Sequence, residues 1–196
     1  MSETRVQPPA QRAPATWLLM AINGAVFLAL AAKAGAWAAL PSEALLRWGA
    51  NFGPLTAGGE WWRLGTAVFL HGGAVHLGVN LWALWVGGRL VERLFGSAVL
   101  LILYLLAGFA GSIGSVLLHP QGVISVGSSG AVFGVFGALL AFLATHRRAI
   151  EPRALWHVAV PAIVFVIASL AFGVAQPGID NAAHLGGLAA GAGGGW

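Results

Sequence analysis

The chain of 196 residues contains no cysteine, a single aspartate and a single lysine. Without cysteine it has no disulfide, no thiolate nucleophile and no cysteine metal site. Charged residues make up only 8% of the chain, whereas hydrophobic residues make up 58%. A water-soluble domain of this length needs far more charge to cover its surface. The composition therefore argues against a soluble fold and predicts an integral membrane protein.

The net charge of +4 does not indicate nucleic-acid binding, because the basic residues are scattered at the ends of apolar segments rather than clustered. Residues 1–15 are polar and precede an apolar run that lacks a small-residue cleavage site, so we expect a flexible cytoplasmic tail rather than a signal peptide. The remainder, residues 16–196, is expected to form one membrane domain without a second soluble domain.

Six apolar segments follow this tail, and their unbroken hydrophobicity favours helices over a membrane barrel. They cover Thr16–Leu40, Thr66–Leu90, Phe95–Leu118, Ser129–Thr145, Ala154–Val174 and Ala182–Trp196. The predicted fold class is all-α, a polytopic membrane protein with six transmembrane helices. Only twelve residues follow His184, about 18 Å of helix. We therefore expect the last helix to be either unusually short or cut off in this chain.

Orientation follows from the distribution of basic residues, because cytoplasmic loops carry more lysine and arginine. With the tail in the cytoplasm, seven basic residues lie inside and three lie outside: Arg5, Arg12, Arg89, Arg93, Arg147, Arg148 and Arg153 against Lys33, Arg47 and Arg63. We expect a multi-pass protein of the bacterial inner membrane with its N-terminus inside. The tryptophan-rich loop 41–65 is expected to lie partly in the membrane interface on the outer side.

The second, fourth and sixth segments then run in parallel, from the outer face inward. Unusual polar residues stand at the start of all three: His71, His76 and Asn80; Ser128 and Ser129; and His184. Polar residues inside a span usually face the bundle interior and mark function. Small residues spaced four apart start beside both Ser129 and His184, which lets the fourth and sixth helices approach closely. These are Gly130 and Gly134 on one helix and Ala183, Gly187 and Gly191 on the other.

Taken singly, each polar residue has an ordinary structural explanation, since a serine in an apolar helix usually packs and a buried histidine usually makes a hydrogen bond. The combination favours catalysis, because imidazole can take the proton of a serine hydroxyl and make it nucleophilic. Free N–H groups at the start of the fourth helix, with His76 and Asn80 one turn apart, could stabilise an oxyanion. From this chemistry alone, the nucleophile could be Ser128 or Ser129.

Five motifs in order resemble those of the rhomboid family of intramembrane serine proteases. They are Trp62-Arg63, the H-x4-H-x3-N pattern of His71, His76 and Asn80, the E-x3-G of Glu92 and Gly96, the G-x-S-G of Gly127-Ser128-Ser129-Gly130, and the A-H-x2-G-x3-G of Ala183, His184, Gly187 and Gly191. Together they extend from Trp62 to Gly191.

The resemblance implies a rhomboid-type bundle in which Ser129 is the nucleophile and His184 the general base of a dyad. It implies an oxyanion hole made of His76, Asn80 and the backbone N–H of Ser129, and cleavage of transmembrane substrate helices near the outer surface, without metal or cofactor. His71, bonding within the first loop, and the side chains of Arg63 and Glu92 would be structural by the same resemblance.

Two further residues stand near the predicted base. Phe133 occupies a position that is often Tyr in the family, and its ring could stack on His184 and orient it. Asp180, one turn before His184, could orient the imidazole as a third member, although the resemblance implies a dyad without a carboxylate.

Other classes of function fit the sequence less well. An HExxH zinc site is missing, position 131 is Ala so the G-x-S-x-G elbow of soluble hydrolases is unmatched, and one aspartate cannot form an aspartyl pair. A rhomboid-like protein that binds transmembrane helices without cleaving them generally lacks the serine or the histidine. A small transporter or channel would not account for small-residue faces beside both polar residues. The sequence fixes no oligomeric state.

Overall fold

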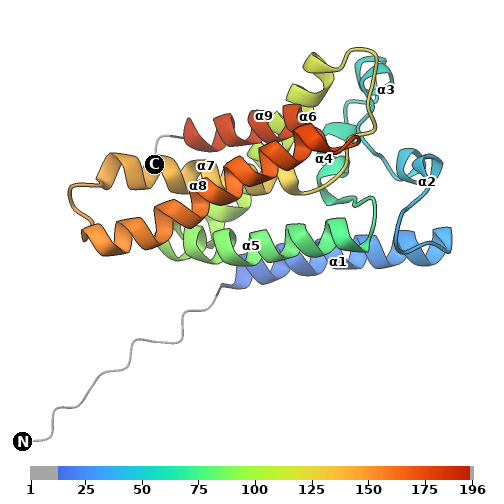
Figure 1. The fold of residues 1–196 in the computed structure, drawn as a ribbon. Coiled ribbons are helices and arrows are strands. Elements are labelled where there is room, and N and C mark those ends of the chain that lie inside the picture. Colours follow the sequence, from blue (N-terminus) through green and yellow to red (C-terminus); the bar gives the residue numbers. More distant parts are fainter. Residues whose placement is uncertain (1–12, 195–196) are drawn as a thin grey trace, which may run out of the picture.

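The computed structural model describes residues 13–194, which are helical apart from loops and one isolated antiparallel bridge between Asn51 and Ser125. Figure 1 shows the long helices packed side by side, with the short helices gathered at one end. The long helices are α1 (Pro14–Ala34), α5 (Ala74–Phe95), α6 (Ser97–Leu118), α7 (Ser129–His146), α8 (Pro152–Ala175) and α9 (Asn181–Ala192). The short ones are α2 (Ser42–Arg47), α3 (Gly53–Ala57), α4 (Arg63–Thr66) and the 3₁₀ helix η1 (Ala67–Phe69).

The all-helical prediction is confirmed, but six spans are not. Four helices of the described chain are long and apolar enough to cross a membrane: α1, α6, α7 and α8. A fifth span results if α4, η1 and α5 are counted together across a bend of 91°. Helix α9 covers 12 residues, which is shorter than the roughly 20 that cross a bilayer core. The N-terminal tail was predicted to end at residue 15; residues 1–12 lie outside the described part, and α1 begins at Pro14.

Three predicted helix boundaries differ clearly from the structure. The second helix ends at Phe95 rather than Leu90, and the other two differences arise at glycines within apolar runs. The first helix stops at Ala34 rather than Leu40, since Gly35 adopts a left-handed conformation with φ of 65°. The second was predicted from Thr66, but α5 begins only at Ala74, after a break at Gly72 and Gly73. The segment that follows α1 docks on this break, where the N–H of Ala74 donates to the carbonyl of Trp37. His71 therefore lies before α5 and not within it.

Helix α9 packs against both α6 and α7 (Figure 1) through glycines that bring backbones into contact. A Cβ added to Gly187 would overlap the carbonyl of Gly130, and one added to Gly191 would overlap the carbonyl of Gly134. On the α6 side, a Cβ at Gly111 would stand 2.6 Å from the carbonyl oxygen of Ala183. Close backbone approach of this kind needs small residues. These contacts fix the depth of α9 against α7.

A single buried carboxylate joins the starts of α1 and α6 to the end of α5. Glu92 accepts hydrogen bonds from the backbone N–H groups of Ala15 and Thr16, at 2.8 and 2.9 Å, and from the hydroxyls of Thr16 and Ser97, at 2.7 and 2.6 Å. N–H groups at a helix start have no intrahelical acceptor, and the helix dipole there favours negative charge. Glu92 is thus placed as a structural link far from the first turn of α5.

The first loop, residues 41–65, is held together by a buried arginine. Arg63 donates to the carbonyls of Leu46 and Ala50 at 2.7 and 3.0 Å and pairs with Glu60 at 2.7 Å. Its guanidinium also lies over the ring of Trp62, 4.6 Å from the centroid. A charged group that is 6% exposed needs such partners. Arg63 therefore organises this loop and does not reach Ser129.

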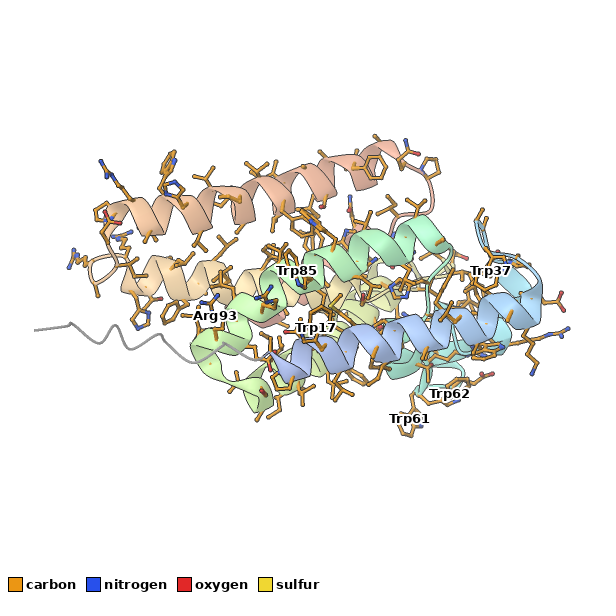
Figure 2. All side chains as sticks on the ribbon, turned by 90° about the horizontal axis from the view of Figure 1, so that it is seen from below. Trp17, Trp37, Trp61, Trp62, Trp85 and Arg93 are labelled. Carbon is orange, nitrogen blue, oxygen red and sulfur yellow. The ribbon has the colours of Figure 1, made fainter. Side chains whose placement is uncertain are left out.

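Exposed aromatic side chains mark the outside of the bundle. Trp61 is 69% exposed, and Figure 2 shows Trp61 and Trp62 projecting outward beside α1. In the same view Trp37 lies toward one end of the long axis and Arg93 toward the other. Tryptophan prefers the headgroup level of a bilayer, and arginine marks segment ends. This surface fits the membrane protein indicated by the apolar helices.

Candidate active site

Ser129 and His184 are 55 positions apart in the sequence and lie on different helices, yet their side chains are in contact. Ser129 is the first residue of α7, and His184 lies in the first turn of α9. The His184 Nε2 atom lies 2.9 Å from the Ser129 Oγ atom, which is hydrogen-bond distance. Both helices begin at the same end of the bundle because glycine contacts hold them at matching depth. The arrangement places an imidazole where it can accept the serine proton.

Two further side chains hold the His184 ring. The Phe133 ring, one turn into α7, stacks on it in parallel, with centroids 4.3 Å apart and planes at 2°. The Nδ1 atom of His184 lies 3.1 Å from the Oδ1 atom of Asn181. Sequence reasoning missed Asn181, although its position three residues before His184 on one helix face was a usable signal.

Asp180, considered above as a possible third member, serves another purpose in the described chain. Its carboxylate caps α9 by accepting from the N–H of Ala183 at 3.2 Å, and it lies 3.6 Å from Nδ1 of His119. Asp is a preferred residue at a helix N-terminus for this reason. The side chain beside His184 Nδ1 is the neighbouring Asn181.

Ser128 and Ser129 face different surroundings. Ser128 is fully buried, and its hydroxyl lies 3.3 Å from Nε2 of His71. His71 was predicted to bond within the first loop. In the structure it lies in the break between η1 and α5, and its ring contacts Ser128. Of Ser128 and Ser129, it is Ser129 whose hydroxyl contacts His184.

His76 and Asn80 lie one turn apart on α5 and face the start of α7. The N–H of Gly72 donates to Nδ1 of His76 at 3.4 Å, which leaves Nε2 to carry the ring proton. A Cβ added to Gly127 would stand 2.8 Å from that Nε2 atom, and Gly127 has a φ of 126°, so only glycine fits. Asn80 donates one amide hydrogen to the carbonyl of His76 at 2.9 Å and keeps a second for another acceptor.

The segment before Ser129 is clamped to the first loop. Asn51 and Ser125 exchange backbone hydrogen bonds of 3.1 and 2.9 Å, and the N–H of Gly127 donates to the carbonyl of Ala67 at 3.0 Å. The Asn51 side chain also donates to the carbonyl of Ser112 in α6 at 2.9 Å. These bonds fix the backbone that leads into Ser129.

A cavity of about 810 Å³ opens onto these residues. Its lining includes His76, Asn80, Ser129 and His184, and on the α8 side Phe165 and Phe172. A cavity of this size matches ligand sites in general. The structure therefore brings together five predicted site residues around this cavity: His76, Asn80, Ser129, Phe133 and His184. Arg63 and Glu92 lie elsewhere. Within residues 13–194, no three histidine or acidic side chains are grouped so as to hold a metal ion.

The candidate site lies in the part of the chain that is similar to known proteins. The family model of the rhomboid domain matches residues 58–196, which is most of the chain and includes every candidate site residue. The chain belongs to the rhomboid family. Its motif order and its all-helical fold agree with this membership, and rhomboid relatives place it among membrane proteins.

Among the similar relatives, the rhomboid protease GluP of Bacillus subtilis (strain 168) is 42% identical over 176 residues, which cover 90% of this chain and 33% of GluP. RHOMBOID-like protein 4 of Arabidopsis thaliana is 43% identical over 134 residues, 68% of this chain and 33% of that protein. Inactive RHOMBOID-like protein 8 of the same plant is 34% identical over 141 residues, 71% of this chain and 39% of that protein. The chain thus spans less than half the length of these rhomboids.

Proposed function

We propose that this rhomboid is an intramembrane serine endopeptidase that cleaves transmembrane substrate helices near the outer membrane face through a dyad of Ser129 and His184. The observation that carries the proposal is the 2.9 Å contact between His184 Nε2 and Ser129 Oγ beside an open cavity. The relationship to a rhomboid protease at 42% identity supports it.

In this mechanism His184 takes the hydroxyl proton while Ser129 Oγ attacks the substrate carbonyl carbon, which gives a tetrahedral intermediate. His184 then gives that proton to the leaving amine as the peptide bond breaks, which leaves an acyl-serine. Water, deprotonated by His184, attacks the acyl carbon, and the proton returns to Ser129 as the ester bond breaks. Every proton transfer passes through His184.

The oxyanion would bind three donors at the start of α7 and α5. The N–H of Ser129 has no intrahelical acceptor because it begins α7. The Nε2–H of His76 and the second amide hydrogen of Asn80 face the same cavity. Donors preorganised in this way stabilise the charge that develops in the transition state.

The proposed orientation in the membrane rests on the arginines that lie at the end of the bundle opposite to Ser129. Arg147 and Arg148 follow the end of α7, whereas Ser129 begins the same helix. Arg153 stands at the start of α8 and Arg93 in the last turn of α5. With these arginines in the cytoplasm of a bacterium, the N-terminus is inside and the dyad lies toward the outer face.

The test is cleavage by the purified chain in detergent or liposomes. We expect a single-span substrate with small residues near its outer end to be cut, with an N-terminal sequence of the product at that level. A fluorophosphonate serine probe is expected to label Ser129, located by mass spectrometry. Labelling at Ser128, or no labelling of folded protein, would contradict the proposal.

Removal of the oxyanion donors is expected to slow the chemical step. His76→Ala and Asn80→Ala should each lower kcat by roughly 10²- to 10³-fold, the usual cost of one oxyanion donor. KM should change little, since the donors act on the charged intermediate. Steady-state kinetics of cleavage measure this, and kcat values within twofold of the wild type would refute the assignment.

The second candidate function is non-proteolytic binding of transmembrane helices. It is kept because one relative is named inactive. The Ser129–His184 contact favours proteolysis, because mere binding requires no such pair. Capture of a single-span helix without cleavage, by folded wild-type protein, would decide for the second function.

A further inference from the structure

The side-chain amide of Asn181 lies between two partners that fix which way it points. Its Nδ2 atom donates to the carbonyl oxygen of Leu170 in α8 at 3.0 Å, and its Oδ1 atom faces His184 Nδ1 at 3.1 Å. A backbone carbonyl can only accept a hydrogen bond. The amide nitrogen must therefore face Leu170, and the amide oxygen must face His184.

This orientation selects one protonation form of the neutral imidazole. An amide oxygen can only accept, so Nδ1 of His184 has to carry the ring proton and donate it to Asn181. The other ring nitrogen, Nε2, is then unprotonated and points at the Ser129 hydroxyl at 2.9 Å. The opposite tautomer would set two lone pairs against each other at Nδ1 and offer Ser129 no base.

We propose that Asn181 is a positioning residue that holds His184 in the tautomer able to accept the Ser129 proton, using the Leu170 carbonyl of α8 as its own anchor. The inference rests on the proposed protease function and adds a third side chain to the dyad. Asn181 is absent from the cavity lining of the described chain, whereas its neighbours Asp180 and Ala183 belong to it. Its effect is therefore exerted through His184 rather than on substrate.

Helix α8 is shaped to receive this amide. A Cβ added to Gly173 would overlap the Asn181 side chain, so glycine leaves the space that the amide occupies. The phenyl ring of Phe133 holds the imidazole face at 4.3 Å, but a stacked ring cannot choose between the two nitrogens. Stacking on Phe133 fixes the plane of the His184 ring, and the hydrogen bond to Asn181 fixes which ring nitrogen carries the proton.

Nitrogen NMR of the full chain tests the tautomer without any need for activity. In protein labelled with ¹⁵N-histidine at mildly alkaline pH, His184 is expected to show a protonated, pyrrole-like Nδ1 and an unprotonated, pyridine-like Nε2. The signals that vanish in His184→Ala identify this residue among the six histidines. A protonated Nε2, or signals averaged between two tautomers, would overturn the inference.

Kinetics test the consequence for turnover. Asn181→Leu, which is similar in size but lacks the acceptor, is expected to lower kcat about 10- to 100-fold, the value of one hydrogen bond to a group that becomes charged in the transition state. KM should stay within about twofold of the wild type. A wild-type kcat in this variant would overturn the inference.

A second variant reaches the same amide from α8. Gly173→Ala keeps Asn181 but fills the space that its amide occupies. This variant is expected to lower kcat and to give His184 nitrogen signals averaged between the two tautomers. Gly24→Ala is the matched control, since no atom lies within 4 Å of a Cβ there, and it should leave both readings unchanged. If Gly173→Ala leaves both readings at wild-type values, the α8 anchor is wrong.

The outcomes separate this inference from the function on which it rests. Wild-type protein that neither cleaves nor takes the serine probe refutes the protease function, whatever the NMR shows. Wild-type protein that cleaves, together with Asn181→Leu that cleaves equally well, refutes only the role of Asn181.

Discussion

Ser129→Ala is expected to abolish cleavage, with a loss of at least about 10⁴-fold in kcat/KM and no change in unfolding temperature. The hydroxyl has His184 as its partner, and its removal leaves only binding and oxyanion donors to act on the peptide bond. Cleavage of a single-span substrate, with thermal unfolding in the same detergent, measures both quantities.

The matched control is Thr145→Ala at the opposite end of the same helix. Thr145 is exposed and its hydroxyl bonds only to the carbonyl of Ala141, at 2.8 Å, so activity should stay at the wild-type level. Ser129 and His184 should also act as one unit, so the Ser129→Ala, His184→Ala double variant is expected to lose no more than either single variant. Additive losses would contradict the dyad.

Gly187→Ala is expected to give the largest loss of stability. Its Cβ would overlap the carbonyl of Gly130, so α9 has to move away from α7. Overpacking of a tight core costs about 1–3 kcal/mol, and the same displacement would lengthen the Ser129–His184 contact. We therefore expect a lower unfolding temperature and, at a temperature where the variant is folded, a lower kcat.

Gly24→Ala provides the comparison here as well, because α1 has open space at that position. The two substitutions add the same methyl group to an apolar helix, so only the neighbours differ. Equal unfolding temperatures for the two variants would show that the α7–α9 contact does not limit stability.

Hydropathy predicts the long helices well because an apolar run of about 20 residues has few alternatives in a membrane. The predicted fourth and fifth segments match α7 and α8 to within two residues at each end. The boundaries at Gly35 and at Gly72–Gly73 were missed, since an apolar run continues in sequence while the backbone turns. The short helices within loop 41–65 have no periodic signal, and the buried Arg63 that organises them could be recognised only by family resemblance.

The candidate site could be predicted in its main members, because histidine and serine stand out in apolar helices. Their partners could not be predicted as readily. Asp180 attracts attention as the single aspartate, but the helix geometry gives it the capping role and turns the next side chain, Asn181, toward His184. His71 lies where the chain bends by 91°, and no local pattern in the sequence reveals either that bend or the contact of His71 with Ser128.

The order of the helices along the chain has a consequence for biogenesis. Ser129 leaves the ribosome 55 residues before His184, and α8 has to be inserted between them. Both helices that α9 contacts, α6 and α7, are made before it, and their glycines form part of the close contacts that seat α9. If Ser129 and His184 form the proposed dyad, the nascent chain lacks its base until α9 has been made. We therefore expect no cleavage of neighbouring transmembrane helices during synthesis of helices α1 to α8.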